Sequence, residues 1–196
     1  MLTLCIDTAY KYLTCALIKD DEILAYDSFE CFKKQSEELF ISLNKIFDQA
    51  NIKHDEIDSI CISDGPGSYT GTRIAMTLAK TMGETLPCDL YTISTLRLYA
   101  NNMPNTMVIM NARADRAYVG VYDKNNIVVD DYVSEVSKID YKDYNVVGDG
   151  NLIGKADNYP SIPEAFLNTK AVWTKVDKIA FLVPKYLKES ESYLKW

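Results

Sequence analysis

The chain has 196 residues, of which 47% are hydrophobic and 25% are charged, a composition typical of a globular protein with one domain or two small lobes. The formal net charge is −7 and the sequence contains no basic run, whereas proteins that bind nucleic acid usually have a basic face. We therefore expect any contact with RNA to be made through another subunit. No segment approaches the roughly 18 unbroken apolar residues of a membrane helix, and no signal peptide is recognisable. We therefore expect a cytoplasmic protein that does not contact a membrane.

The first half of the chain alternates short apolar runs with amphipathic stretches. Runs of apolar residues predict strands at 2–6, 13–18, 23–27, 57–63 and 90–93. The first three have short connections, which indicates an antiparallel meander. Apolar residues at helical spacing predict helices at 37–50, 71–86 and 95–100.

The second half begins near residue 105 and reads mostly as strands. These are expected at 107–110, 117–122 and 127–133, with a hairpin turn at 124–126 and a further turn at 148–150. A helix is expected at 177–182. Because strands are followed by helices twice, we predict two α/β lobes, one of residues 1–103 and a smaller one of residues 104–196.

Few residues are suited to binding a metal or attacking a substrate. The five cysteines contain no CxxC pair and mostly lie in or beside apolar runs, which predicts reduced thiols packed as small hydrophobic residues. The single histidine, His54, has charged neighbours and is expected on a surface loop. One histidine cannot complete a histidine-ligated metal site or a Ser–His–Asp triad. We therefore expect no catalytic residues and no metal site in this chain.

The most distinctive segment is the glycine-rich stretch GPGSYTGTR at residues 65–73, between a predicted strand and a predicted helix. This layout is that of a phosphate cradle, but the glycine spacing is one residue off the dinucleotide fingerprint and the lysine of a Walker A loop is missing. The alternative is a tight turn in which Ser68 or Thr70 caps the helix. Arg73 lies in the first helical turn, where it opposes the helix dipole, so it should have a partner.

Asp7 and Thr8 end the first predicted strand. An acid at this place can position a metal-bound phosphate, as in ATPases of the actin and sugar-kinase type, although those loops have a glycine close by and here none occurs before Gly65. A plain Asp–Thr turn is the alternative. One hypothesis is therefore a nucleotide-binding, ATPase-like subunit that uses the Asp7 turn and loop positions Gly65, Gly67, Ser68, Thr70 and Gly71.

Together these segments resemble the TsaB (YeaZ) family of bacterial tRNA-modification proteins. Residues 65–74 are similar to the family's GPGSFTGLRIG, and residues 4–8 (LCIDT) are similar to its opening IDTS turn. Weaker similarities follow in the same order at 94–96, at 112–113 and at 184–188 (PKYLK). The chain departs from the family where Gln35 replaces a histidine, Asn111 an aspartate and Ala75 a glycine.

The resemblance implies a two-lobed actin-like (ASKHA, RNase H-like) α/β fold with mixed sheets and flanking helices. It also implies that the chain is not an enzyme but a partner of a TsaD-like catalytic subunit. With a TsaE-like ATPase, that complex transfers a threonylcarbamoyl group to the adenosine next to the anticodon of tRNA, and ATP and metal would be used by the partner subunits, with no cofactor of this chain's own. In the family the helices at 37–50 and 71–86 bundle with those of the partner, or with a second copy in a homodimer. The expected interface residues are Phe40, Leu43, Phe47, Arg73, Leu78 and Met82.

Overall fold

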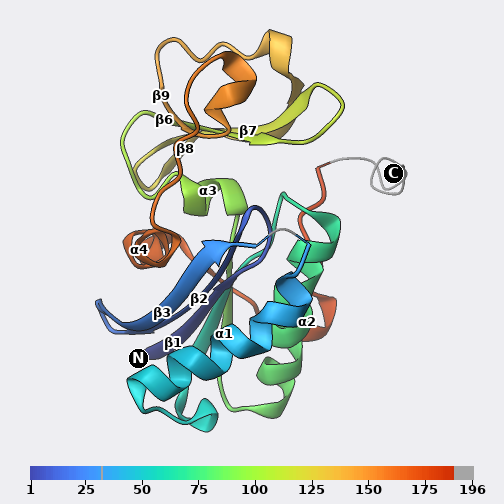
Figure 1. Ribbon diagram of the computed structural model, residues 1–196. Helices are drawn as coiled ribbons and strands as arrows, with labels where there is room; N and C mark the ends of the chain where they lie inside the picture. The colour runs from blue at the N-terminus through green and yellow to red at the C-terminus, as the bar shows by residue number, and fades with distance from the viewer. Residues whose placement is uncertain (32, 188–196) are drawn as a thin grey trace.

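A computed structural model describes residues 1–31 and 33–187, which form two lobes, each built on its own mixed sheet (Figure 1). The six-stranded sheet of the first lobe has the order β10-β5-β4-β1-β2-β3, and the four-stranded sheet of the second has the order β8-β7-β6-β9. The strands of the first sheet are β1 Leu2–Asp7, β2 Tyr12–Lys19, β3 Glu22–Glu30, β4 Ser59–Ser63, β5 Asp89–Ile93 and β10 Thr174–Lys175. Those of the second are β6 Thr106–Asn111, β7 Arg116–Asp123, β8 Asn126–Glu135 and β9 Asn145–Gly148.

Four α-helices are described, α1 Gln35–Ala50, α2 Tyr69–Thr85, α3 Thr95–Tyr99 and α4 Ile162–Asn168. In Figure 1, α1 and α2 cover one face of the first sheet, while α4 lies on the other face and α3 lies between the two sheets. Within the described ranges, no helix combines the length and the apolar character needed to cross a membrane.

Side-chain alternation along the central strands of the first sheet builds two separate cores. Strand β1 is buried along its whole length, between antiparallel β2 and parallel β4. Leu4 and Ile6 face the core under α1 and α2, whereas Cys5 faces the core shared with α3, α4 and the second sheet. Cys61 of β4 lies on that same side. All five cysteines are free thiols and four are buried, which confirms the prediction made for them.

The strand and helix predictions for residues 1–133 are confirmed in order and type, and the meander of β1, β2 and β3 is confirmed with them. Three elements were not predicted, the strand β9, the helix α4 and the short strand β10. The helix expected at 177–182 is wrong, because only the 3₁₀ turn Ile179–Phe181 forms there.

The chain does not remain in the second lobe after crossing into it near residue 104. Strand β10 pairs antiparallel with β5 in the first sheet, and α4 packs against β1, β2 and β3. The expected lobe of residues 104–196 is therefore divided, since its later described part belongs spatially to the first sheet.

Residues 179–187, here called the C-terminal strap, run along α2. The Lys80 ammonium donates to the carbonyl oxygens of Ala180 at 3.0 Å and Leu182 at 3.2 Å. The Lys185 backbone N–H donates to the Asp64 carbonyl at 2.8 Å, which brings the strap to the end of β4. Residues 188–196, including Lys188 of the family-like PKYLK segment, lie outside the described part of the chain, as does Phe32.

Candidate functional site

The glycine-rich loop of residues 65–71 lies directly on the backbone of the Asp7 turn. A Cβ at Gly67 would overlap the Ala9 carbonyl oxygen, and a Cβ at Gly71 would overlap that of Thr8. Gly65 has a φ of +108°, and a Cβ there would meet the carbonyl oxygen of the strap residue Lys185 at 2.8 Å. The glycines are therefore needed for close backbone approach between loop, turn and strap.

Hydrogen bonds join the same segments. The Ser68 N–H donates to the Ala9 carbonyl at 2.7 Å. The Thr8 hydroxyl donates to the Gly71 carbonyl at 2.6 Å and accepts from the Ala75 N–H at 3.3 Å. Ser68 also accepts from the Gly71 N–H at 3.2 Å, so Ser68, rather than the exposed Thr70, caps α2. These polar groups of the loop and turn contact one another.

Asp7 is fully buried at the end of β1, and both of its carboxylate oxygens have protein partners. Oδ1 accepts from the Ser63 hydroxyl and from the Ala9 N–H at 3.0 Å, and Oδ2 accepts from the Tyr99 hydroxyl at 3.0 Å. Burial raises the pKa of Asp7, and these three hydrogen bonds oppose the rise. The contacts make Asp7 an anchor between β1, β4 and α3.

A second carboxylate, Asp149, joins the two lobes. It follows β9 and accepts from the Tyr10 and Tyr159 hydroxyls, from the Asn111 N–H at 2.6 Å, and from the Lys11 ammonium at 2.7 Å. Burial alone would raise the pKa of Asp149, but Lys11, the two hydroxyls and the Asn111 N–H together hold it below its usual value. These five residues, here called the interlobe cluster, could not be recognised as a site from the sequence, because they come from three distant segments.

The apolar residues of helix α1 differ in their exposure to solvent. Phe40 is 60% exposed and its neighbour Ile41 is 63% exposed. Leu43 and Phe47, which were expected to form an exposed interface, are only 6% and 2% exposed and belong to the core under α1 and α2. The expectation is wrong for these two residues because the inward stripe of α1 packs on the sheet of its own chain. Ile41 was not among the expected residues.

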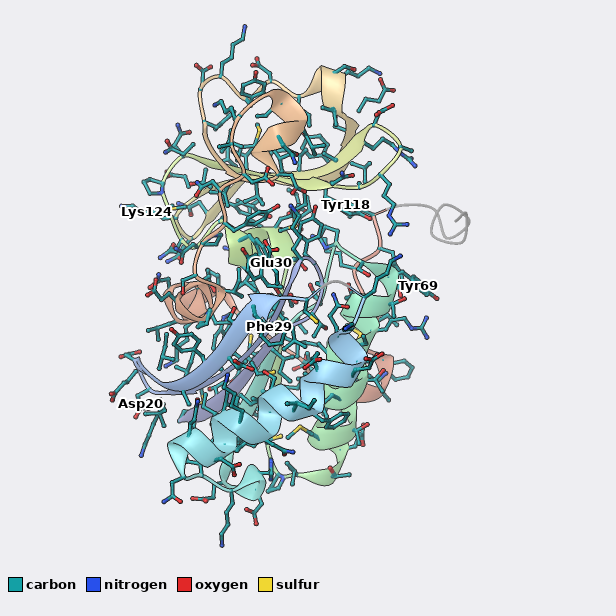
Figure 2. All side chains as sticks on the ribbon, viewed as in Figure 1. Asp20, Phe29, Glu30, Tyr69, Tyr118 and Lys124 are labelled. Carbon is teal, nitrogen blue, oxygen red and sulfur yellow. The ribbon has the colours of Figure 1, made fainter. Side chains whose placement is uncertain are left out.

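Helix α2 places Arg73 at the surface beside two tyrosines. The Arg73 guanidinium donates to the Tyr69 hydroxyl at 2.6 Å and lies 5.1 Å from the centre of that ring, so the expected partner of Arg73 is Tyr69. The Tyr69 ring in turn stacks on Tyr186 of the strap, with ring centres 5.4 Å apart. Leu78 and Met82 are half-buried against the core. Figure 2 shows Tyr69 at the outer side of α2, close to its start.

Four of the exposed residues on these two helices, Phe40 and Ile41 of α1 with Tyr69 and Arg73 of α2, are called the helix face below. Glu37 and Lys45 of α1 are exposed on either side of the two apolar residues. In the residues that the structure covers, no group of three or more His, Cys, Asp or Glu side chains is arranged to hold a metal ion.

Comparison with known proteins places the chain in a family. The family model described as TsaD, tRNA N6-adenosine threonylcarbamoyltransferase, matches residues 30–148. The tRNA threonylcarbamoyladenosine biosynthesis protein TsaB of Bacillus subtilis (strain 168) is 27% identical, over 100% of this chain and 98% of that protein. TsaB of Buchnera aphidicola subsp. Schizaphis graminum is also 27% identical, over 65% of this chain and 63% of that protein.

Solved structures agree on the fold. YeaZ from Pseudomonas aeruginosa matches with a TM-score of 0.79 and 18% identity, over 95% of this chain and 99% of that one. A second Pseudomonas aeruginosa structure, described as an uncharacterized protein with similarity to peptidase YEAZ, matches with a TM-score of 0.83. The mixed sheets with flanking helices are those of the actin-like ASKHA fold predicted from the sequence. The chain therefore belongs to the TsaD family defined by that model and, within it, to the TsaB (YeaZ) proteins.

Proposed function

We propose that this chain is a non-catalytic subunit of tRNA threonylcarbamoyladenosine biosynthesis in the cytoplasm, and that it pairs with a TsaD-like catalytic subunit. The match to a curated TsaB protein over the whole chain supports the pathway. In this proposal the TsaD-like partner, with a TsaE-like ATPase, carries the metal, the ATP and the contact with tRNA.

The observation that carries the pairing role is the exposure of Phe40 and Ile41, side by side on α1. Large apolar residues exposed next to one another are typical of protein interfaces, and aromatic and arginine side chains contribute most to binding there. Tyr69 and Arg73 supply such side chains at the start of α2, already oriented by their mutual contact. The proposed interface is therefore the helix face, with Leu78 and Met82 at its half-buried margin.

The nucleotide-binding alternative has less support from the contacts. It requires Asp7, Thr8 and the loop backbone to face a phosphate or its metal ion. The Asp7 oxygens instead accept hydrogen bonds from Ser63, Ala9 and Tyr99, and the Thr8 hydroxyl is bonded to the first turns of α2. Binding a phosphate at this place would require these buried contacts to be broken, so we favour the pairing role.

The pairing role is tested with the variant Phe40→Asp, titrated calorimetrically into the TsaD-like protein of the same cell. A charge placed in the centre of a desolvated apolar contact should weaken binding by at least roughly tenfold. Val128→Asp is the matched control, because Val128 is 56% exposed and lies on edge strand β8 of the other lobe. Equal affinities of Phe40→Asp and the wild type would remove the helix face from the proposal.

Two further variants separate the loss of pairing from the loss of folding. Phe47→Asp would place a charge in the core, so its failure to bind would report unfolding rather than loss of an interface. Arg73→Ala instead removes a surface contact, and we expect it to keep the fold while weakening the complex.

A further inference from the structure

The C-terminal strap carries two exposed apolar side chains. Phe181 is 78% exposed and Val183 is 70% exposed, more than any other large apolar side chain of the described residues. Leu182, which stands between them in the chain, packs against the core under α1 and α2. The strap therefore has two sides, one packed on its own lobe and one that presents apolar side chains to solvent.

Helix α2 holds the strap in place at these residues. The Lys80 ammonium donates to the carbonyl oxygens of Ala180 at 3.0 Å and of Leu182 at 3.2 Å, one on each side of Phe181. A backbone that is already fixed presents Phe181 and Val183 at a lower conformational cost than a free chain end would. The strap is thus suited to contact a partner.

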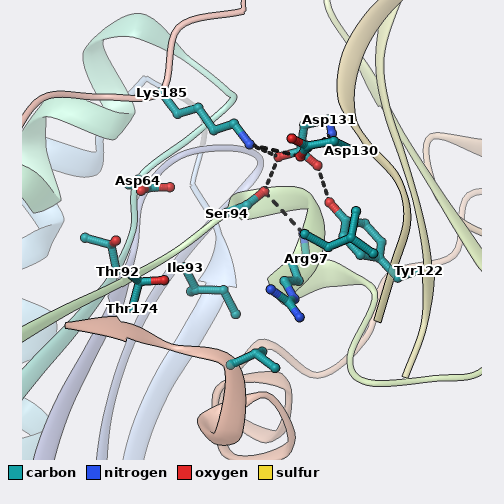
Figure 3. Close-up of a pocket in the computed structure, with 12 residues that line it drawn as sticks. Asp64, Thr92, Ile93, Ser94, Arg97, Tyr122, Asp130, Asp131, Thr174 and Lys185 are labelled. Atoms are coloured by element: carbon teal, nitrogen blue, oxygen red, sulfur yellow. Dashed lines mark hydrogen bonds and ion pairs between the residues drawn. The ribbon is translucent and has the colours of Figure 1, made fainter. Parts of the chain in front are cut away.

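The far end of the strap is fixed as well. The Lys185 ammonium reaches the carboxylates of Asp131 at 3.0 Å and Asp130 at 3.4 Å, both in the second lobe (Figure 3). The Lys185 backbone N–H donates to the Asp64 carbonyl oxygen at 2.8 Å. The two exposed side chains therefore lie between two anchored points.

The strap lies next to the helix face. Tyr186 stacks on Tyr69 in the first turn of α2, with ring centres 5.4 Å apart, whereas the Lys80 contacts lie about three turns further along the helix. The strap therefore runs antiparallel to α2, and Val183 lies beside the helix between Tyr69 and Lys80 (Figure 1). The exposed side of the strap thus adjoins the helix face on the same lobe.

The helix face alone is too small for a stable complex. A specific protein interface covers about 800 Å² on each partner. A fully covered aromatic side chain contributes only about 150–250 Å², and the four helix-face side chains are already partly covered by their own chain. A partner that binds the helix face must therefore reach beyond it, and the strap supplies the adjoining apolar surface.

Arg73 indicates the charge of the surface that covers it. Its guanidinium donates to the neutral Tyr69 hydroxyl and forms no ion pair with the side chains that the structure describes. A carboxylate on the partner would complement this charge, since hydrogen bonds between a guanidinium and a carboxylate are among the strong ones.

We propose that the TsaD-like subunit covers the strap together with the helix face, packing apolar side chains on Phe181 and Val183 and placing a carboxylate against Arg73. This inference rests on the pairing role proposed above. It extends the interface from α1 across α2 to the strap, and it assigns the exposed side of the strap to the same partner rather than to a second copy of this chain.

The test is calorimetric titration of the intact variants Phe181→Asp and Val183→Asp into the TsaD-like protein. Phe181→Asp should weaken binding by at least roughly tenfold, because it places a charge in a desolvated apolar contact. Its melting temperature should stay that of the wild type, since the side chain is exposed in the free protein. Val183→Asp should weaken binding in the same direction.

Tyr26→Asp is the matched control. Tyr26 is 57% exposed on edge strand β3, and its neighbour Ala25 faces the core under α1 and α2. Because side chains alternate along a strand, Tyr26 lies on the opposite face of the sheet from the helix face and the strap. It should bind as the wild type does.

Phe40→Asp, titrated in parallel, separates this inference from the pairing role. Weaker binding by Phe40→Asp with unchanged binding by Phe181→Asp would overturn the inference and leave the pairing role standing. A wild type that does not bind would contradict both. Phe181→Asp that loses self-association but keeps the heterocomplex would assign the strap to a second copy, which also overturns the inference.

The charge of the partner surface is tested at Arg73. Arg73→Glu should weaken binding more than Arg73→Gln does, because a like charge would then face the partner's carboxylate. Equal effects of the two variants would contradict the presence of that carboxylate.

Discussion

Asp7 and Asp64 stand at the ends of the neighbouring parallel strands β1 and β4, and burial raises the pKa of both carboxyl groups. They differ in their partners. Asp7 accepts three hydrogen bonds, whereas Oδ1 of Asp64 accepts none from the residues that the structure covers. A pKa raised by folding means that the folded protein holds the proton more tightly than the unfolded chain does. The stability that such a group contributes is therefore complete at low pH and is lost as the pH rises through the folded pKa.

For Asp64→Asn we expect a more stable protein at pH 8, by about 1–2 kcal/mol, because the variant no longer buries an unpaired charge. The gain should fade between pH 6 and pH 4, since the folded pKa of Asp64 is about 6 and its ordinary value is 3.8. Urea unfolding at pH 8 and pH 4 measures both values. A variant less stable than the wild type at pH 8 would mean that the carboxylate has a favourable partner in the free protein.

Phe40 and Phe47 occupy one helix but should respond differently to truncation. Phe47→Ala removes a side chain that is 2% exposed, so we expect a loss of about 3–5 kcal/mol of unfolding free energy. Phe40→Ala removes one that is 60% exposed and should change stability by less than about 0.5 kcal/mol. Denaturant unfolding of the two variants makes the comparison. Similar losses would contradict the orientation of α1 described above.

At the scale of elements, the interlobe cluster is one of the polar contacts that join the lobes. Asp149 comes from the second lobe, and two of its partners, Tyr10 and Lys11, come from the turn between β1 and β2. The pKa of Asp149 is held below its usual value, so its contribution to stability is present above pH 4 and is lost as the pH falls through the folded pKa. Acid should therefore loosen the contact between the lobes before it affects the apolar cores.

Asp149→Asn tests this contact. The amide cannot match the charge of Lys11, and its NH₂ group faces a donor, so we expect a loss of about 2 kcal/mol at pH 7. The difference between variant and wild type should shrink below pH 4, because the unfolded chain takes up a proton there before the folded carboxylate does. Thermal unfolding from pH 3 to pH 7 gives both numbers. A pH-independent difference would show that packing, and not the charge, accounts for the loss.

The elements also show how far sequence reasoning reaches. The period of apolar residues was enough for β1 to β8 and for α1 to α3, because each buries a regular stripe or face. It missed β9 and α4, and it missed β10, which has two residues and exists through pairing with β5. The period could not distinguish the exposed Phe40 from the buried Phe47, since both lie within one broad apolar stripe. The interlobe cluster and the contacts of the strap join residues far apart in the chain, and only the fold brings them together.

The whole molecule consists of two lobes joined by charged contacts, with the helix face exposed on the first lobe. Asp149 and the strap residue Lys185 each connect the lobes by charged contacts, and the glycine-rich loop fixes α2 to the end of β1. Helices α1 and α2 pack on the same sheet, and the glycine-rich loop joins α2 to the end of β1, so the two helices have a fixed orientation, which lowers the conformational cost of pairing.

The most direct measurement is the mass, by light scattering, of the species formed when this chain is mixed with the TsaD-like protein of the same cell. The account predicts a stoichiometric heterocomplex with the wild type and with Val128→Asp, formed at the expense of any homodimer, and its loss with Phe40→Asp. Two proteins that are folded but keep their separate masses would contradict the pairing role.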